Sequence, residues 1–253
     1  MKRSPSKLEI ASLNTLGNKL QSKTRTANDA AFIRKHLPAF MAKTSPPTPR
    51  GERRKDYRLS IVPQDDRFDP KSAERRLEAR LWRMFESGSF PFFDGIGQII
   101  SFQVPIYSEK KKHGWGSIDL LGMDDSDGYP VVIELKIAKK TIEPALRAVI
   151  EAVSYMIALR GNWADFAPEW SKRTKRGEIS APKTLTALVL APSDYWTTVE
   201  GDEYLKDALR NLKDLVNALA DCCYAVRFGS IEAKDSGDWR ITGAAKEISI
   251  PFP

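Results

Sequence analysis

Three polar side chains in one short segment have the chemistry needed to cleave a phosphodiester bond. They are Asp119, Glu134 and Lys136, and the segment that carries them, Gly114–Lys136, reads as two strands joined by a turn through Asp-Ser-Asp-Gly. Hydrolysis needs neutralisation of the charge that builds on the phosphoryl oxygens and an activated water, and Mg²⁺ held by carboxylates supplies both. Two carboxylates and an ammonium on one hairpin therefore predict metal-dependent phosphodiester cleavage.

The spacing of these residues indicates how their side chains are oriented. Lys136 follows Glu134 by two positions, so the two share one face of a strand. There the ammonium can orient the water or stabilise the transition state, and the main-chain carbonyl of Leu135 can complete a metal shell. The alternative is a solvent-facing Asp119 with an exposed Glu134–Lys136 ion pair, worth about 0–1 kcal/mol. The apolar residues beside Glu134 argue against it, because a buried carboxylate needs a partner or a metal.

The segments around the hairpin predict the elements that must hold it. Apolar residues at helical spacing predict one helix over Ser72–Phe85, capped by Ser72, and another over Thr141–Leu159. The unbroken apolar run Leu185–Leu190 predicts a buried central strand. We also expect a strand over Gly95–Ile106, a helix over Tyr204–Leu219, a strand over Tyr224–Phe228, an edge strand or tail over Trp239–Ile250, and irregular structure over Gly161–Ala181. This order predicts an α/β fold with a mixed central sheet flanked by helices.

The hairpin motif resembles the PD-(D/E)XK nuclease superfamily, which includes many restriction endonucleases, Holliday-junction resolvases and RecB-type nuclease domains. The matching residues are Gly116-Ser117-Ile118-Asp119, a 14-residue gap, and Ile133-Glu134-Leu135-Lys136. Ile118 stands where the family usually has proline. The resemblance covers roughly residues 70–232 and implies a restriction-endonuclease-like fold, built from a helix, a three-stranded meander, a second helix and a further strand.

The resemblance also implies roles for individual residues. It assigns Mg²⁺, with Mn²⁺ as a substitute, to Asp119, Glu134 and the Leu135 carbonyl, and it makes Lys136 a catalytic group. Many members add a Glu from the preceding helix, for which Glu78 is our choice and Glu74, one turn earlier, the other candidate.

Further residues are candidates for contact with nucleic acid. A Gln-x-x-x-Tyr pair that many members carry on the next helix corresponds here to Glu151 and Tyr155, with Arg147 a turn earlier; Glu replaces Gln. These residues would contact phosphate or position Lys136. The loop Glu109–His113 adds Lys110, Lys111 and Lys112, which would grip the DNA backbone or simply be solvated. Trp163, Trp170 and Trp196 would stack on bases or, as we favour, pack over the core.

Charge separates the chain into two parts. Residues 1–60 hold 14 Lys+Arg and 4 Asp+Glu, a net of +10, while residues 61–253 hold 26 and 29, a net of −3. We expect a basic extension over 1–60, partly helical or disordered and ending in the proline-rich linker 44–58, followed by the nuclease-like domain over 61–253. Such an arm suits sequence-independent phosphate contacts. A solvated tail is the alternative.

Other classes of protein are disfavoured by composition. The chain has no run of about 18 apolar residues and no secretory signal, and its only cysteines, Cys222 and Cys223, are adjacent. We therefore expect no membrane partner and a reducing, cytoplasmic location. No P-loop, GxSxG elbow or HxxxH pattern is present.

The sequence thus predicts a Mg²⁺-dependent deoxyribonuclease in repair, restriction or defence. RNA as substrate, endo- or exonuclease polarity, sequence preference and a homodimer are left open. The alternative from another class is a non-catalytic module that keeps the nuclease fold and binds nucleic acid or a protein.

Overall fold

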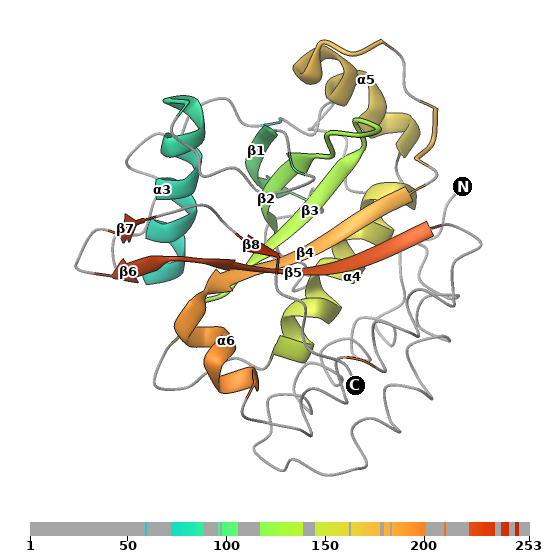
Figure 1. Cartoon of the computed structure of the whole chain (residues 1–253). Coiled ribbons are helices and arrows are strands. Elements are labelled where there is room, and N and C mark those ends of the chain that lie inside the picture. Colours follow the sequence, from blue (N-terminus) through green and yellow to red (C-terminus); the bar gives the residue numbers. More distant parts are fainter. Residues whose placement is uncertain are drawn as a thin grey trace.

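The elements of the fold surround one central sheet (Figure 1). The computed structural model describes residues 59, 72–88, 96, 98–105, 117–138, 145–161, 163–177, 180–182, 184–200, 210, 223–235, 239–242 and 246–247. The described elements are α3 (Ala73–Glu86), β1 (Gln98–Pro105), β2 (Ser117–Met123), β3 (Pro130–Leu135), α4 (Ala145–Gly161), α5 (Trp163–Thr174), β4 (Thr184–Pro192), α6 (Ser193–Glu200), β5 (Cys223–Ile231), β6 (Ala233–Asp235), β7 (Trp239–Ile241) and β8 (Lys246–Glu247).

The central sheet is mixed, as predicted. Its strand order is β1-β2-β3-β4-β5-β8. The first three strands form an antiparallel meander, β3, β4 and β5 run parallel, and the two-residue strand β8 lies antiparallel at the far edge. Parallel neighbours need crossover connections, and α4 with α5 supplies the one between β3 and β4. The α/β class and the helix-flanked mixed sheet are therefore confirmed.

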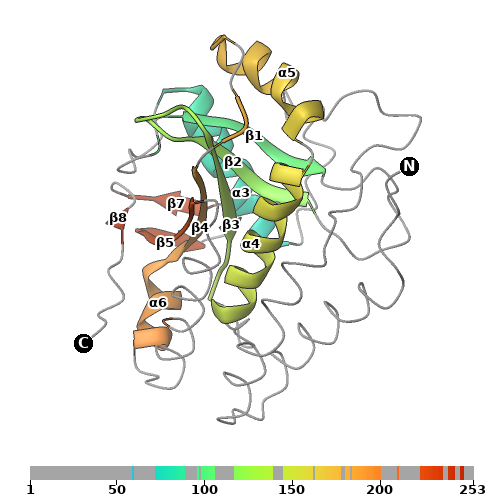
Figure 2. The same cartoon turned by 90° about the vertical axis from the view of Figure 1, so that its right-hand side faces the viewer.

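Two apolar clusters lie against the sheet, one for each face. One joins α4, α5 and α6 to the sheet, and the other joins α3 to it. In Figure 2, α3 lies behind the meander and α4 in front of it. We call these clusters the α4 cluster and the α3 cluster. Successive side chains of β3 alternate between them: Val132 belongs to the α4 cluster, and Val131 and Ile133 belong to the α3 cluster. Each helix is thus fixed against the strands that carry the candidate site.

Helix α3 forms where the sequence predicts it. Ser72 caps its start by accepting a hydrogen bond of 3.4 Å from the Arg75 N–H. Leu77, Leu81 and Trp82 form its buried face.

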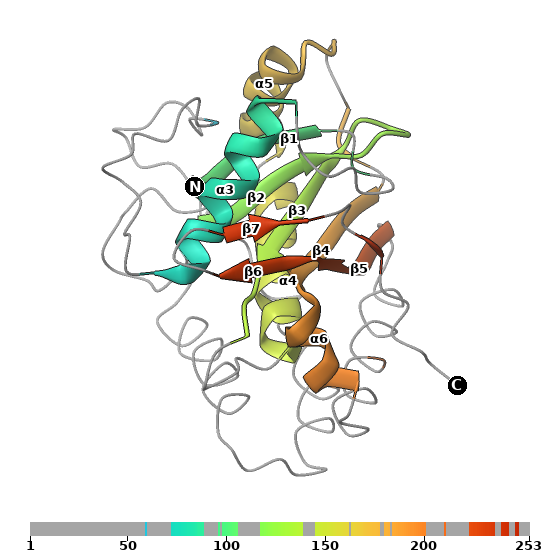
Figure 3. The ribbon, with the colours of Figure 1, turned by 60° about the vertical axis from the view of Figure 1, so that its left-hand side comes forward.

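A small hairpin, β6–β7, holds α3 from outside the main sheet (Figure 3). The indole N–H of Trp239 donates to the Ala73 carbonyl at 2.7 Å, and Arg76 forms an ion pair with Asp235 at 2.8 Å. The segment Trp239–Ile250, expected as an edge strand or tail, supplies β7 of this hairpin and the edge strand β8. This hairpin from the last part of the chain therefore helps to place the first described helix.

The β2–β3 hairpin is also confirmed. Backbone pairing runs from Met123 opposite Pro130 to Leu120 opposite Ile133. The turn closes through hydrogen bonds from the Asp124 N–H to the Tyr129 carbonyl and from the Gly128 N–H to the Asp124 carbonyl. Gly128 has φ +76°, a left-handed conformation that favours glycine.

The predicted irregular segment Gly161–Ala181 is wrong over most of its length, because α5 occupies it. Trp163, Phe166 and Trp170 recur at helical spacing and are buried in the α4 cluster. Burying each aromatic side chain contributes about 1.5–3 kcal/mol. Together they outweigh the cost of about 3 kcal/mol for Pro168 inside the helix.

The tryptophans pack in the core rather than standing ready to stack on bases. Trp163, Trp170 and Trp196 are all buried. The indole N–H groups of Trp170 and Trp196 donate to the carbonyls of Gly128 and Gly229, respectively. Trp196 lies in α6, which starts directly after β4 and was not predicted.

Several predictions concern residues outside this description. They include the basic extension, except Leu59, and the helix Tyr204–Leu219, of which only Arg210 is described and is helical. Leu59 is buried in the α4 cluster, and its N–H donates to Glu169 Oε2 at 3.4 Å. Among the described helices, none has the length and apolar character needed to cross a membrane.

Candidate active site

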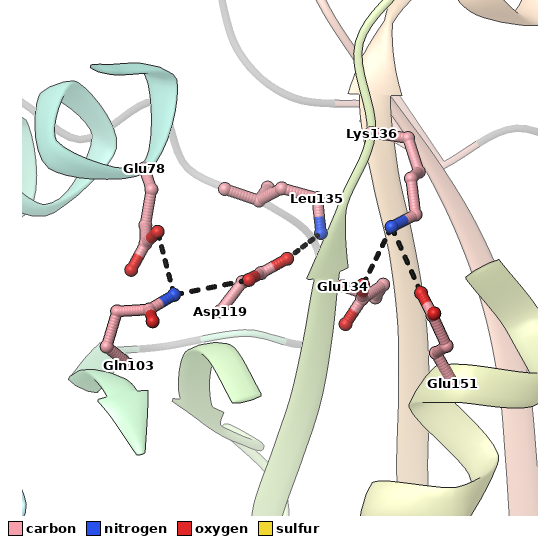
Figure 4. Close-up of polar contacts among 7 residues, drawn as sticks. All are labelled: Glu78, Gln103, Asp119, Glu134, Leu135, Lys136 and Glu151. Carbon is pink, nitrogen blue, oxygen red and sulfur yellow. Dashed lines mark hydrogen bonds and ion pairs between the residues drawn. The ribbon is translucent and has the colours of Figure 1, made fainter. Parts of the chain in front are cut away.

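Residues from five elements, together with Lys136 just after β3, meet at the end of the β2–β3 hairpin that lies opposite its turn (Figure 4). They are Glu78 of α3, Gln103 of β1, Asp119 of β2, Glu134 and Leu135 of β3, Lys136 just beyond β3, and Glu151 of α4. A sequence of hydrogen bonds joins Glu78 through Gln103 and Asp119 to the backbone of Leu135. A second network joins Glu134 through Lys136 to Glu151.

Asp119 lies where the two strands of the hairpin separate. Their backbone pairing ends at Leu120 opposite Ile133. Beyond that pair the Lys136 N–H donates to the Leu190 carbonyl of β4, on the other side of β3. The Leu135 N–H instead donates to Asp119 Oδ2 at 2.9 Å, so a carboxylate replaces the missing strand partner. This bond holds Asp119 beside the Glu-x-Lys segment.

Glu134 and Lys136 form a buried ion pair. Each is 4 % exposed, and Lys136 Nζ lies 2.8 Å from Glu134 Oε1. The same ammonium contacts Glu151 Oε2 at 3.2 Å, with Glu151 partly exposed on α4. The alternative of an exposed Glu134–Lys136 pair is therefore excluded, and the buried position that the apolar neighbours of Glu134 predict is the one observed.

Glu78 lies on the other side of Asp119. It is 1 % exposed, and its Oε2 accepts a hydrogen bond of 2.9 Å from Gln103 Nε2. The same Nε2 donates to Asp119 Oδ1 at 3.3 Å. The guanidinium of Arg75, three residues earlier on α3, lies 3.7 Å from Glu78 Oε2. The contacts of Glu78, our choice on α3, thus lead through Gln103 to Asp119.

Burial raises the pKa of all three carboxyl groups. Dehydration, followed by repulsion from Asp119, raises the pKa of Glu78 to about 9 despite the nearby Arg75. Dehydration raises the pKa of Asp119 to about 7, although Lys136 and the Leu135 N–H act in the opposite direction. The pKa of Glu134 also lies well above its usual value, because of burial and then repulsion from Asp119. Without a cation, Glu78 therefore keeps its proton at neutral pH, and the pKa of Asp119 lies close to that pH.

Tyr155 lies on the same helix as Glu151 and is buried in the α4 cluster. Dehydration, together with the negative charges of Glu134 and Glu151, holds its pKa well above the usual range. Its hydroxyl therefore stays neutral at physiological pH.

The donor set suits a hydrated divalent cation. Glu78 Oε1 and Glu134 Oε2 are buried carboxylate oxygens that find no hydrogen-bond partner in the described part of the chain. No three His, Cys, Asp or Glu side chains within the described ranges converge as a preformed metal cluster. Mg²⁺ commonly takes one or two carboxylates and keeps several waters. Asp119, Glu134 and the Leu135 carbonyl fit that coordination, and Glu78 adds an open oxygen nearby.

The predicted site residues divide into three groups. The structure brings together Glu78, Asp119, Glu134, Leu135, Lys136 and Glu151, and it buries Tyr155 in the apolar cluster that contains α4. Lys110, Lys111 and Lys112 lie outside the described residues, and of Arg147 only its place in α4 is described.

Gln103 was missed by sequence reasoning. Nothing local marks it, since it is one polar residue inside an apolar strand. Only its backbone conformation in the structure distinguishes it. Its φ is +47°, in the left-handed region that costs a non-glycine residue about 1–2 kcal/mol.

Comparison with known proteins gives no relative for this chain. No protein-family model, no curated protein and no solved structure matches it.

Proposed function

We propose that this protein is a Mg²⁺-dependent nuclease with a restriction-endonuclease-like fold, acting on DNA. The observation that carries the proposal is the meeting of Asp119, Glu134 and Lys136 where β2 and β3 separate, with both members of the Glu134–Lys136 pair 4 % exposed. Mn²⁺ is expected to replace Mg²⁺.

The burial of this charged group is difficult to explain by stability alone. A buried ion pair is often no more stabilising than apolar residues of the same volume, because dehydrating two charges is costly. Here a second carboxylate, Asp119, lies close enough to repel Glu134. Perturbed and mutually repelling carboxyl groups of this kind are characteristic of functional sites.

The order of elements supports the fold proposal. A helix, an antiparallel meander, a helical crossover and a parallel strand follow one another as α3, β1-β2-β3, α4 with α5, and β4. Helix α3 contributes Glu78 and helix α4 contributes Glu151, so both flanking helices reach the hairpin from opposite faces. This is the arrangement that the Asp119 and Glu134–Lys136 motif requires in the proposed family.

The residues of this chain have distinct tasks in the proposed reaction. Asp119, Glu134 and the Leu135 carbonyl would hold the cation, with Glu78 in support. The bound cation supplies Lewis-acid neutralisation of the phosphoryl charge and lowers the pKa of a water. Lys136 carries a positive charge to the same place, where it orients the attacking water or stabilises the phosphoryl oxygens. Glu151 holds the Lys136 ammonium from the helix side and so limits its position.

Affinity for the substrate would come mostly from outside the site. The excess of positive charge lies in residues 1–60, whose net charge is +10 from 14 basic and 4 acidic residues. Such an arm would contact phosphates without reading sequence. We place the protein in the cytoplasm, in repair, restriction or defence against foreign DNA.

A cleavage assay with the full chain tests the proposal. Supercoiled, linear and single-stranded DNA, and a matched RNA, are incubated with Mg²⁺, Mn²⁺ or EDTA. Cleavage is expected with either metal and not with EDTA. Asp119→Asn and Lys136→Met should each lower the rate by about 10²–10³-fold, the range typical of losing one transition-state contact. Asp125→Asn, on the exposed turn of the same hairpin, and Lys172→Met, exposed on α5, are the matched controls.

Two outcomes would contradict the proposed nuclease activity. One is the absence of cleavage with every metal and substrate, and the other is cleavage that survives Asp119→Asn. Metal-independent binding to DNA without cleavage would favour the non-catalytic module. That alternative has one observation in its favour, since Lys136 is already paired with two carboxylates.

A further inference from the structure

At Gln103 the regular alternation of side chains between the two faces of the sheet is interrupted, and it is interrupted at the same point on the neighbouring strand β2. In a regular strand, residues two apart share a face. On β1, however, Phe102 belongs to the α3 cluster and Val104 to the α4 cluster. On β2, Leu120 and Ile118 divide in the same way. The strands remain paired on both sides of this point, with Phe102 opposite Leu120 and Val104 opposite Ile118.

Gln103 and Asp119 are the residues at which the alternation is interrupted on β1 and β2, respectively. Gln103 takes the left-handed backbone, with φ +47°, that L side chains rarely adopt. Its side chain then lies between Glu78 and Asp119, as Figure 4 shows, and its single Nε2 donates to both carboxylates, at 2.9 and 3.3 Å. A strained conformation that persists next to a charged cluster suggests a functional constraint.

Hydrogen bonds occupy three of the four carboxylate oxygens of Glu78 and Asp119. Gln103 occupies Glu78 Oε2 and Asp119 Oδ1, and the Leu135 N–H occupies Asp119 Oδ2. Glu78 Oε1 is left without a hydrogen-bond partner among the described residues, although it is buried. Gln103 thus fixes one oxygen of Glu78 and leaves the other available beside Asp119.

We propose that Gln103 is a positioning residue that holds the Glu78 carboxylate within reach of the cation bound by Asp119. This inference rests on the proposed metal-dependent function and assigns a residue that the motif does not contain. Glutamine suits the task because its amide donates to carboxylates without adding charge. A lysine or arginine here would compete with the cation, and a carboxylate would add repulsion.

Metal binding, measured without substrate, tests the inference. The full chain is titrated with Mn²⁺ by isothermal titration calorimetry. Gln103→Leu removes the amide, and Gln103→Asn keeps an amide and tolerates the left-handed backbone but is one methylene too short to span both carboxylates. Both should weaken Mn²⁺ binding by about 10–100-fold, as expected when a partner that orients a metal ligand is lost. Gln98→Asn, at the exposed start of the same strand, is the matched control and should leave the affinity unchanged.

The coupling between Gln103 and Glu78 provides a second criterion. Glu78→Gln should weaken Mn²⁺ binding in the wild-type background. In the Gln103→Leu background the same change should add less than about threefold, because Glu78 is no longer held in place. Fully additive losses would overturn the positioning role.

A measurement on the wild-type chain avoids any dependence on how the variants fold. The side-chain amide resonance of Gln103 in ¹⁵N spectra should shift on titration with Mg²⁺ and reach a plateau as the metal site fills. An unmoved resonance, or normal Mn²⁺ affinity in Gln103→Leu and Gln103→Asn, would overturn the inference while leaving the metal site intact. A wild-type protein that binds no Mn²⁺, or binds it equally after Asp119→Asn, would overturn the proposed function and this inference with it.

Discussion

The carboxylate of Asp119 accepts a hydrogen bond of 2.9 Å from the main-chain N–H of Leu135, between two strands whose backbone pairing has already ended. This bond gives the motif its geometry, because it keeps Asp119 beside Glu134 and Lys136 although the strands separate. It also makes the carboxylate part of the fold. Changes at the site are therefore expected to alter stability as well as activity.

Removing the Lys136 charge should destabilise the protein. Lys136→Met leaves the buried Glu134 without its cation, and breaking such a pair from one side typically costs about 3–5 kcal/mol. The loss should be larger at pH 8 than at pH 5, because Glu134 can take up a proton at the lower pH. Urea unfolding at the two pH values measures this. Lys172→Met, at an exposed position of α5, should change stability by less than about 0.5 kcal/mol.

The metal-free protein should lose stability as pH rises. Burial raises the pKa of Asp119 from 3.8 to about 7 and that of Glu78 from 4.5 to about 9. The folded state thus binds more protons than the unfolded state between these values. Each contribution is complete below the unfolded pKa and is lost as pH rises through the folded pKa.

Thermal unfolding in EDTA between pH 5 and pH 9 checks this pH dependence. The midpoint should fall across the range, and Glu78→Gln should flatten the fall because the amide does not titrate. A midpoint that rises with pH, or a slope that Glu78→Gln leaves unchanged, would show that these carboxyl groups do not control it.

Divalent cations should offset the loss of stability that the metal-free protein shows as pH rises. At a free concentration 100 times the dissociation constant, a bound ion stabilises the folded state by about 2.7 kcal/mol. For a chain of this size the melting temperature should rise by about 5–10 °C on adding Mg²⁺ or Mn²⁺. Differential scanning fluorimetry detects the shift. Asp119→Asn should abolish it, whereas Asp125→Asn should retain it in full.

The β6–β7 hairpin should stabilise α3 mainly through Trp239. Trp239→Phe removes the indole N–H that donates to the Ala73 carbonyl. Loss of this partly buried hydrogen bond should destabilise by about 1–3 kcal/mol. Asp235→Asn weakens the partly exposed ion pair with Arg76, so a change of about 0–1 kcal/mol is expected. Chemical denaturation ranks the two variants. A larger effect for Asp235→Asn would contradict a main role for Trp239 in holding α3.

Local patterns were sufficient where one segment determines its own structure. The N-cap and apolar spacing of α3, the turn of the β2–β3 hairpin and the apolar run of β4 all matched the structure. They failed for α5, which occupies a segment that was expected to be irregular. There the decision came from burial of Trp163, Phe166 and Trp170 against α4 and the sheet, which a local pattern does not measure.

The sequence by itself determined that Asp119, Glu134 and Lys136 share one hairpin, because a turn and a two-residue alternation depend only on neighbouring residues. Only the tertiary structure decided which other residues join them. Gln103 reaches Glu78 and Asp119 through a left-handed backbone and the pairing of β1 with β2, and Glu151 reaches Lys136 through the packing of α4 on the sheet. Such contacts depend on strand register and helix packing, which are fixed only when distant segments bury their apolar faces together.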